Sequence, residues 1–224
     1  MIRADEALGD CPLCQGPAWP FARVGAQAYG RCGRCELTWL APGQRPAQGR
    51  ERAEYLLHCN DADDPGYRRF LGRLAAPLLD RLAGRSQVLD FGCGPGPALA
   101  AILREAGHEV AVHDPWFAPY QAVLARRYDA VTCTEVVEHL HEPAKAMASV
   151  RSLLRPGGIL AVMTSMLDDG IDFQRWHYRR DCTHVAFWRP RSFEWLARGW
   201  GWRCEPVAPG VVFLHAPADT TARR

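Results

Sequence analysis

The sequence predicts an α/β domain with a doubly wound, mostly parallel sheet, preceded by a small zinc-binding segment. Three observations carry this prediction. From residue 86 onward, short β-like runs alternate with amphipathic helical runs, an order typical of a parallel sheet with helices on both faces. A glycine-rich turn follows the first of these runs. Before residue 50, four cysteines fall in two closely spaced pairs.

The composition is that of an ordinary globular chain. Its 224 residues are 48% hydrophobic and 23% charged, and the formal net charge is +2, so charge alone indicates no polyanionic partner. No apolar run reaches the roughly 20 residues that span a bilayer, and no membrane association is expected. The N-terminus lacks the apolar segment of a secretion signal. Nine cysteines without such a signal favour a reducing compartment, and a cytoplasmic location is expected.

Residues 1–50 are predicted to form a zinc ribbon and a linker that begins at Leu40. Each C-x2-C pair makes a tight turn that directs two thiolates to one point, and two such turns complete a closed tetrahedron typical of structural zinc. The segment is too short to bury a core without a metal. Residues 18–31 are typical of a hairpin. Two redox-active pairs, the alternative, would need a thioredoxin-like βαβ context, which is absent. The predicted zinc ligands are Cys11, Cys14, Cys32 and Cys35.

Residues 51–85 are predicted to form a helical bridge. Apolar residues recur there at helical spacing, and residues 61–66 break the stretch into two helices that we expect to pack on the following domain. A ligand-facing role is a second interpretation for His58 and Asn60.

Residues 86–218 carry the predicted α/β domain. A buried strand over 87–91 leads into a turn with Gly92, Gly94 and Gly96 and then into a helix. Glycines allow a ligand to approach the backbone, and a helix N-terminus offers unpaired N–H groups. The next strand ends at Asp114, where a carboxylate is placed to accept hydrogen bonds from ribose hydroxyls. Two more strands follow, ending near residues 134 and 165.

Four segments, in order, resemble the class I S-adenosylmethionine-dependent methyltransferases, which have a Rossmann-like fold: "VLDFGCGPG", "VAVHDP", "YDAVTCTEVVEHL" and "LLRPGGIL". The resemblance covers about residues 86–165, and "THVAFWRPRSFEWLARGWGW" extends it to about residue 202. A dinucleotide dehydrogenase would not explain the last two of the four. The resemblance implies S-adenosyl-L-methionine as cofactor. It implies that the methionine part lies against Asp90, Gly92 and Gly94, the ribose against Asp114, the adenine near Trp116, and the sulfonium beside Thr134 and Glu135.

The chain departs from the family pattern after the second strand. Only residues 116–127 separate that strand from the third, which is too short for the usual helix and strand. We expect this element to be shortened or missing, reduced to the run over 121–125.

The stretch "TEVVEHLHEP" places Glu135, Glu138 and His139 at spacings i, i+3 and i+4, on one face if it is helical. Two carboxylates and an imidazole suit Mg²⁺ or Mn²⁺. The pattern resembles the metal site of small-RNA 3′-terminal 2′-O-methyltransferases and a Glu-x-x-Glu-His in ubiquinone-pathway O-methyltransferases. His184 is then the fourth candidate ligand, with His177 second. A metal-free role for His184 or Glu138 as base or orienting group, and a purely structural role, are the alternatives. The predicted catalytic residues are Glu135, Glu138, His139 and His184.

A run dense in aromatic, arginine and histidine residues follows the fourth strand, above the edge of the sheet where ligands bind. Arginines beside aromatics can stack on a planar acceptor or pair with an anionic one. The predicted acceptor-binding residues are Trp176, His177, Tyr178, Arg179 and Arg180.

The sequence therefore predicts an S-adenosylmethionine-dependent methyltransferase that acts on an oxygen or nitrogen of a small-molecule acceptor, which is favoured over RNA. One alternative is an RNA methyltransferase with a metal-assisted, 2′-O-methylation-like site. The other is a non-catalytic, zinc-dependent binding protein on a methyltransferase core.

Overall fold

The larger of two sheets carries the predicted α/β fold. The structure is a computed structural model that describes residues 8–57 and 61–219. Strands β4 (Gln87–Phe91), β5 (Glu109–His113), β6 (Tyr128–Thr134) and β7 (Leu154–Met163) are mutually parallel. The order is β5-β4-β6-β7-β10-β9, and the hairpin of β9 (Arg203–Ala208) and β10 (Val211–His215) pairs antiparallel with β7. The predicted mostly parallel sheet is confirmed, whereas the hairpin was not predicted.

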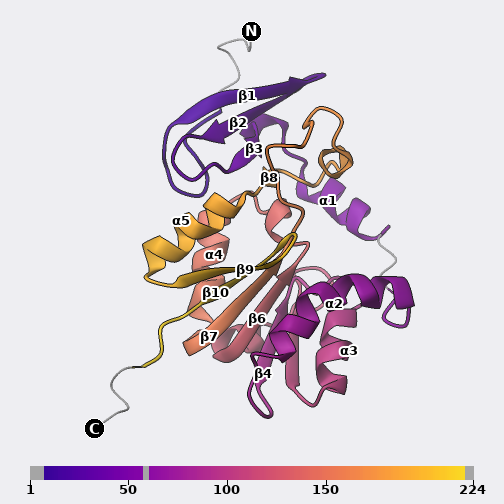
Figure 1. Cartoon of the computed structure of the whole chain (residues 1–224). Helices are drawn as coiled ribbons and strands as arrows, with labels where there is room; N and C mark the ends of the chain where they lie inside the picture. The colour runs from indigo at the N-terminus through magenta and orange to yellow at the C-terminus, as the bar shows by residue number, and fades with distance from the viewer. Residues whose placement is uncertain (1–7, 58–60, 220–224) are drawn as a thin grey trace.

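Helices cover both faces of this sheet (Figure 1). On one face, α2 (Pro65–Leu79) and α3 (Ala98–Glu105) pack on Val88, Ala130 and Phe213. On the other, α4 (Pro143–Ser152) and α5 (Pro190–Trp200) pack on neighbouring residues of the same strands, such as Leu89 and Val131. Successive strand residues point to opposite faces, so each parallel strand is apolar on both sides, and the doubly wound prediction is confirmed.

The predicted loss of one element is also confirmed. After β5 the chain forms only a short 3-10 helix, η2 (Gln121–Ala125), before it enters β6. Strand β5 is consequently the edge of the sheet.

The N-terminal ribbon forms a second sheet. Strands β1 (Ala18–Val24) and β2 (Gln27–Cys32) make the predicted hairpin. Two further strands were not predicted: β3 (Thr38–Leu40) and β8 (Ala186–Phe187), which comes from the far end of the chain and pairs with β3. The linker prediction was wrong at its start, because Leu40 is a fully buried strand residue.

Two helices lie between the ribbon and the large sheet along the chain. A 3-10 turn, η1 (Pro42–Gln44), precedes α1 (Gln48–Tyr55), which begins three residues earlier than predicted. Helix α2 begins at Pro65, inside the break predicted at 61–66, and Asp64 caps it by accepting a hydrogen bond from the backbone N–H of Tyr67. His58 and Asn60 lie outside the described residues. Within residues 8–57 and 61–219, no helix is both long and apolar enough to cross a bilayer.

Candidate active site

The glycine turn after β4 lies at the carboxyl edge of the sheet. Gly92 has φ +76° and Gly94 has φ +65°, a region that favours glycine. A Cβ added at Gly92 would lie 2.4 Å from a methyl carbon of Val136, the residue that follows Glu135. The glycine turn and the turn after β6 are therefore in direct contact. Gly96 lies just before α3, and its carbonyl accepts a hydrogen bond from Ala98 N (2.7 Å).

Two aspartates lie beside this turn. Asp114 accepts hydrogen bonds from the backbone N–H groups of Gly94 (3.2 Å), Trp116 (2.8 Å) and Phe117 (3.0 Å). A carboxylate has about four acceptor positions, so the contacts that fix this side chain leave capacity for a ligand. Asp90 is buried and accepts from the Thr132 hydroxyl (2.8 Å). Burial raises the pKa of Asp90 to about 6.

Other features of this edge fit the predicted cofactor. The Thr134 hydroxyl oxygen is buried and has no hydrogen-bond partner among the described residues, which is the condition expected of a group that meets a ligand. Trp116 is exposed at the tip of β5, and the Arg52 guanidinium lies 5.8 Å from its ring centroid. The residues predicted to line S-adenosylmethionine thus lie along one edge of the sheet, and their individual roles stay predictions.

The turn after β6 is not a regular α-helix, so the helical face that Glu135, Glu138 and His139 would share is not formed. Glu135 has φ +51°, a left-handed conformation that non-glycine residues seldom adopt outside functional sites and turns. A single 3-10 turn, η3 (Val137–His139), follows. The backbone N–H of Glu135 donates to the Met163 carbonyl (2.8 Å), which holds the turn against the end of β7.

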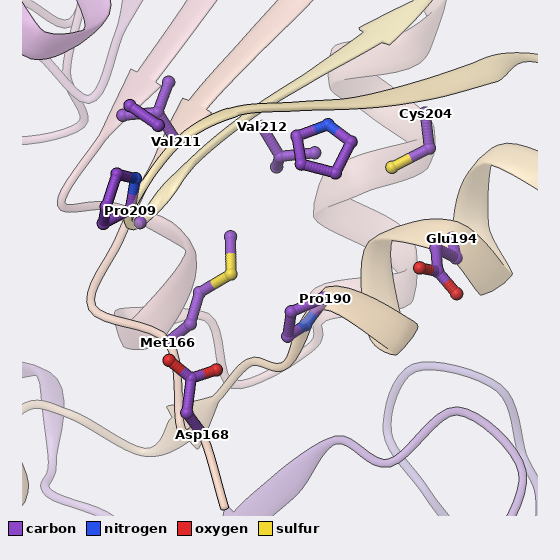
Figure 2. Close-up of a pocket in the computed structure, with 11 residues that line it drawn as sticks. Met166, Asp168, Pro190, Glu194, Cys204, Pro209, Val211 and Val212 are labelled. Carbon is purple, nitrogen blue, oxygen red and sulfur yellow. The ribbon is translucent and has the colours of Figure 1, made fainter. Parts of the chain in front are cut away.

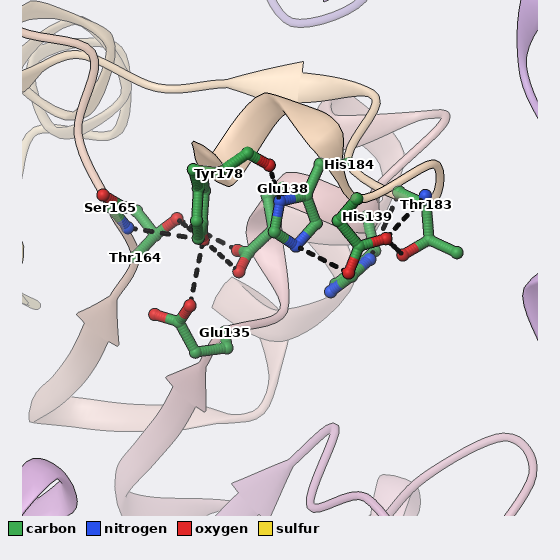
Figure 3. A network of polar contacts seen from close by, with 9 residues as sticks. Glu135, Glu138, His139, Thr164, Ser165, Tyr178, Thr183 and His184 are labelled. Carbon is green, nitrogen blue, oxygen red and sulfur yellow. Dashed lines mark hydrogen bonds and ion pairs between the residues drawn. The ribbon is translucent and has the colours of Figure 1, made fainter. Parts of the chain in front are cut away.

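Glu135 and Glu138 form a buried polar network around the hydroxyl of Tyr178 (Figure 3). That hydroxyl hydrogen-bonds to Glu138 and lies 3.1 Å from a Glu135 carboxylate oxygen. The Thr164 hydroxyl donates to the other Glu138 oxygen (3.0 Å), and the Ser165 N–H donates to the Tyr178 oxygen (3.3 Å). One phenol hydrogen cannot serve two carboxylates, so a proton on one carboxyl group completes the network.

The burial of this network changes its proton affinities. Desolvation, together with the neighbouring Glu138 charge, raises the pKa of Glu135 to about 8. Desolvation also raises the pKa of Glu138 to about 7, against the hydrogen bond from Tyr178, which lowers it. The Tyr178 pKa is raised by burial and by both carboxylates. At neutral pH the pair therefore holds about one proton between its two carboxyl groups.

His139 and His184 lie beside Glu138, with ring centroids 4.7 Å apart. One ligand atom from each of these three residues lies within 4.8 Å of the others. His139 Nδ1 is 3.2 Å from the Thr183 carbonyl, and His184 Nδ1 is 2.7 Å from the Tyr178 carbonyl. A carbonyl partner fixes the proton on Nδ1 and makes Nε2 the acceptor nitrogen of the neutral ring. Glu135 is not part of this group and reaches it through Tyr178.

The structure separates the five predicted acceptor residues. The 3-10 helix η4 (His177–Arg180) carries Tyr178 into the carboxylate network, while His177 and Arg180 are exposed. Trp176 packs in an aromatic cluster against the ribbon. Arg179 is buried, and its hydrogen bonds run to the ribbon and to its own loop rather than to the carboxylates.

Several neighbours of the site were missed by the sequence analysis. Thr164 at the end of β7 has no distinguishing sequence pattern. Asp181, whose carboxylate lies 3.8 Å from His184 Nε2, belongs to the run dense in aromatic and arginine residues but was not assigned a role. Tyr55 on α1 lies edge-on to His139, with ring centroids 5.3 Å apart. In the sequence, Tyr55 indicated only the apolar spacing of a helix and no role in the site.

A cavity of about 170 Å³ lies elsewhere, between α5 and the β9–β10 hairpin (Figure 2). It is lined mainly by proline, valine and alanine side chains, with Asp168 and Glu194 at its side, and includes none of the predicted site residues.

The four ribbon cysteines are buried, and their sulfur atoms lie within 4.8 Å of one another. The Cys11 and Cys35 sulfurs are 3.5 Å apart, and those of Cys14 and Cys32 are 3.3 Å apart. This closed set of four thiols fits a tetrahedral zinc ion, which would hold the two knuckles of the ribbon together.

The fold and the site define a class I methyltransferase. Residues 67–207, more than half of the chain, match the model of a family described as a methyltransferase domain. The chain belongs to this family, and the S-adenosylmethionine-dependent class predicted from the sequence is confirmed.

Known relatives agree with this assignment. The ubiquinone biosynthesis O-methyltransferase of Aromatoleum aromaticum is 33% identical over 105 residues, which make up 36% of this chain and 45% of that protein. The protein of the same name from Azotobacter vinelandii is 33% identical over 101 residues, or 35% of this chain and 43% of that protein. The chain thus spans about half the length of the curated relatives it matches.

Solved structures show the same fold. The 1,6-didemethyltoxoflavin-N1-methyltransferase of Burkholderia thailandensis, crystallised with S-adenosylhomocysteine, aligns with a TM-score of 0.54 at 18% identity, over 88% of this chain and 99% of that one. CalO1, a methyltransferase in calicheamicin biosynthesis, aligns with a TM-score of 0.51 at 15% identity, over 76% of this chain and 59% of that one.

Proposed function

We propose that this protein transfers a methyl group from S-adenosylmethionine to an oxygen or nitrogen atom of a small-molecule acceptor. The single observation that carries the proposal is the contact between the two turns. Val136 lies against Gly92, so the carboxylate network at Glu135 begins where the cofactor turn ends. The relatives named for ubiquinone biosynthesis support a small-molecule acceptor.

In the proposed reaction, bound cofactor supplies the methyl group on a positively charged sulfur. The acceptor atom approaches in line with the carbon–sulfur bond, which breaks as the new bond forms, and the electron pair stays on sulfur. The acceptor proton must then leave. Glu135 is the half-buried carboxyl of the network, and we assign its ionised form the role of proton acceptor, a form that becomes more populated as the pH approaches the Glu135 pKa of about 8. Its conjugate acid is held by the Tyr178 oxygen, while Glu138 accepts from Tyr178 and Thr164.

Glu138, His139 and His184 also fit a divalent cation such as Mg²⁺ or Mn²⁺, which is the second candidate mechanism. The observation that favours it is the pair of Nδ1 contacts to backbone carbonyls, because metal-binding histidines usually have such partners. A cation there would orient an acceptor oxygen and lower its pKa. Manganese titration followed by electron paramagnetic resonance tests this mechanism: about one bound ion per chain is expected, and it should be lost in His184→Ala. No binding by the wild-type chain would exclude it.

Calorimetry with S-adenosylmethionine tests the main proposal. Wild-type protein should bind, and Gly92→Ala should not, because a Cβ there overlaps Val136 and the backbone is left-handed. Gly72→Ala on α2 is the matched control, since nothing lies within 4 Å of the added carbon. Absence of binding by the zinc-loaded wild-type chain would refute the enzymatic function.

We propose the same domain division as in the sequence analysis: residues 1–50, 51–85 and 86–218. We also propose a cytoplasmic location, supported by the absence of disulfides among the described cysteines.

A further inference from the structure

The ribbon and the candidate site are joined through the backbone of one residue. Val185 follows His184 directly. Its carbonyl accepts a hydrogen bond from Leu40 N in the ribbon (2.9 Å), and its N–H donates to the Glu138 carbonyl (2.9 Å). The ribbon strand β3, the strand β8 and the site turn η3 therefore lie side by side, and Val185 connects β3 to η3.

Arg179 fastens the same loop to the ribbon through its side chain. Only 9% of the surface of Arg179 is exposed, which is unusual for an arginine. Its guanidinium donates to the carbonyls of Phe173 (3.2 Å) and Gln174 (3.2 Å) in the loop. It also reaches the ribbon, at the Gln27 side-chain oxygen (3.1 Å) and the Tyr29 hydroxyl (3.4 Å).

Apolar side chains pack around these hydrogen bonds of Arg179. Tyr29 of the ribbon contacts Phe173 edge-on at 4.9 Å and Phe187 at 5.9 Å between ring centroids. Trp176 and Leu40 belong to the same buried cluster, which is separate from the two cores of the large sheet. The loop that carries Tyr178 and His184 thus has its main apolar support in the ribbon.

We propose that the ribbon is the positioning element of the site, and that Arg179 is the positioning residue that holds Tyr178 and His184 at Glu138. Arg179 acts through its neighbours and touches neither carboxylate. The description of Tyr178 and His184 as site residues rests on the proposed function, whereas the fastening of residues 173–187 to the ribbon does not.

Hydrogen exchange of the full, zinc-loaded chain tests this role. In Arg179→Met, amides of residues 176–188 should exchange about tenfold faster or more, because charged hydrogen bonds to the ribbon are lost. Strands β4 and β6 should keep their protection, and affinity for S-adenosylhomocysteine should change by less than about twofold. Arg175→Met is the matched control, since Arg175 is exposed in the same loop and makes only a 3.8 Å ion pair with Asp172.

A second readout reports on the site itself. The Nδ1 proton of His184, bound to the Tyr178 carbonyl, should give a slowly exchanging imidazole signal in NMR spectra of the wild type and of Arg175→Met. The signal should disappear in Arg179→Met and return in part in Arg179→Lys. Unchanged exchange and an unchanged signal in Arg179→Met would overturn the proposal, and so would equal effects of the two methionine variants.

If Arg179→Met loses protection throughout the sheet, the test uses Tyr29→Phe in its place. Tyr29→Phe removes one ribbon partner of the Arg179 guanidinium but keeps the aromatic ring of residue 29. Faster exchange confined to residues 176–188 supports the proposal, and wild-type exchange overturns it.

The positioning role and the proposed function fail in different experiments. A wild-type chain that does not bind S-adenosylhomocysteine contradicts the enzyme, whereas a binding chain with an unaffected loop contradicts the positioning role.

Discussion

The hydroxyl of Tyr178 donates a hydrogen bond to the fully buried carboxylate of Glu138, a residue 40 positions earlier in the chain. Both side chains are buried. The contact therefore links the geometry of the loop after β7 to the turn after β6, and the removal of either group takes one hydrogen-bond partner from the other at a buried position.

Tyr178→Phe tests this link. The variant leaves a buried carboxylate without its main donor, and we expect the free energy of unfolding to fall by about 1–3 kcal/mol. Methyl transfer should fall with it, while affinity for S-adenosylhomocysteine is retained. Urea unfolding and calorimetry measure both effects. Tyr120→Phe, at a side chain that is 61% exposed, should leave stability unchanged, and equal losses in the two variants would contradict the assignment.

The carboxylate pair predicts a pH dependence of stability in buffer without added divalent metal. The Glu135 pKa rises from 4.5 to about 8 and that of Glu138 from 4.5 to about 7 on folding, so the folded chain binds protons more tightly than the unfolded chain. This contribution is fully present below pH 4.5 and is lost as the pH rises through 7 to 8. Urea unfolding across this range should show wild-type stability falling towards alkaline pH. Glu135→Gln should flatten the decline, and an unaltered decline would argue against the shared proton.

Asp114→Asn tests the ribose site. The amide oxygen can still accept from Trp116 and Phe117, so the turn should fold, but the charge and one acceptor oxygen are lost. Affinity for S-adenosylhomocysteine should fall about tenfold or more, since hydrogen bonds to a charged group contribute about 1.5–3 kcal/mol. Calorimetry measures this loss. Asp80→Asn, an exposed position at the end of α2, should bind like the wild type.

Cys32→Ser tests the zinc ribbon. Elemental analysis should find about one zinc per wild-type chain and less in the variant, because a structural site needs all four thiolates. The variant should also be more susceptible to proteolysis within residues 8–40, as a ribbon of this size depends on its metal. Cys204→Ser, outside the ribbon on β9, should keep full zinc content. A wild-type chain purified without zinc, yet with a protected ribbon, would contradict the structural role.

The parts of the fold that depend on local pattern were predictable. Alternating apolar strands and amphipathic helices indicated the doubly wound sheet, and the short interval between residues 116 and 127 indicated the loss of a helix and strand, of which η2 is the remnant. The cysteine spacing located the four thiols that the fold brings together. Each of these signals spans few residues and needs no knowledge of distant contacts.

Long-range pairing was not predictable from such patterns. The β3–β8 ladder joins residues 38–39 to 186–187, and a two-residue strand has no pattern of its own. Arg179 lies in a run typical of a ligand-binding loop, and only the tertiary structure shows that its partners in the ribbon are Gln27 and Tyr29. The left-handed conformation of Glu135 likewise depends on the docking of the turn against β7. The assignments of individual site residues remain predictions.

The position of β8 in the ribbon sheet has a consequence for synthesis on the ribosome. The ribbon is translated before the sheet domain, and its cysteines can bind a metal early, yet the outer edge of β3 has no partner in the described sheet until residues 186 and 187 emerge. An unpaired strand edge is a template for pairing with other chains. The ribbon therefore leaves the ribosome before the sheet domain but is completed only after β8 has emerged, and chains that end before β8 carry an open strand edge that β8 covers in this structure.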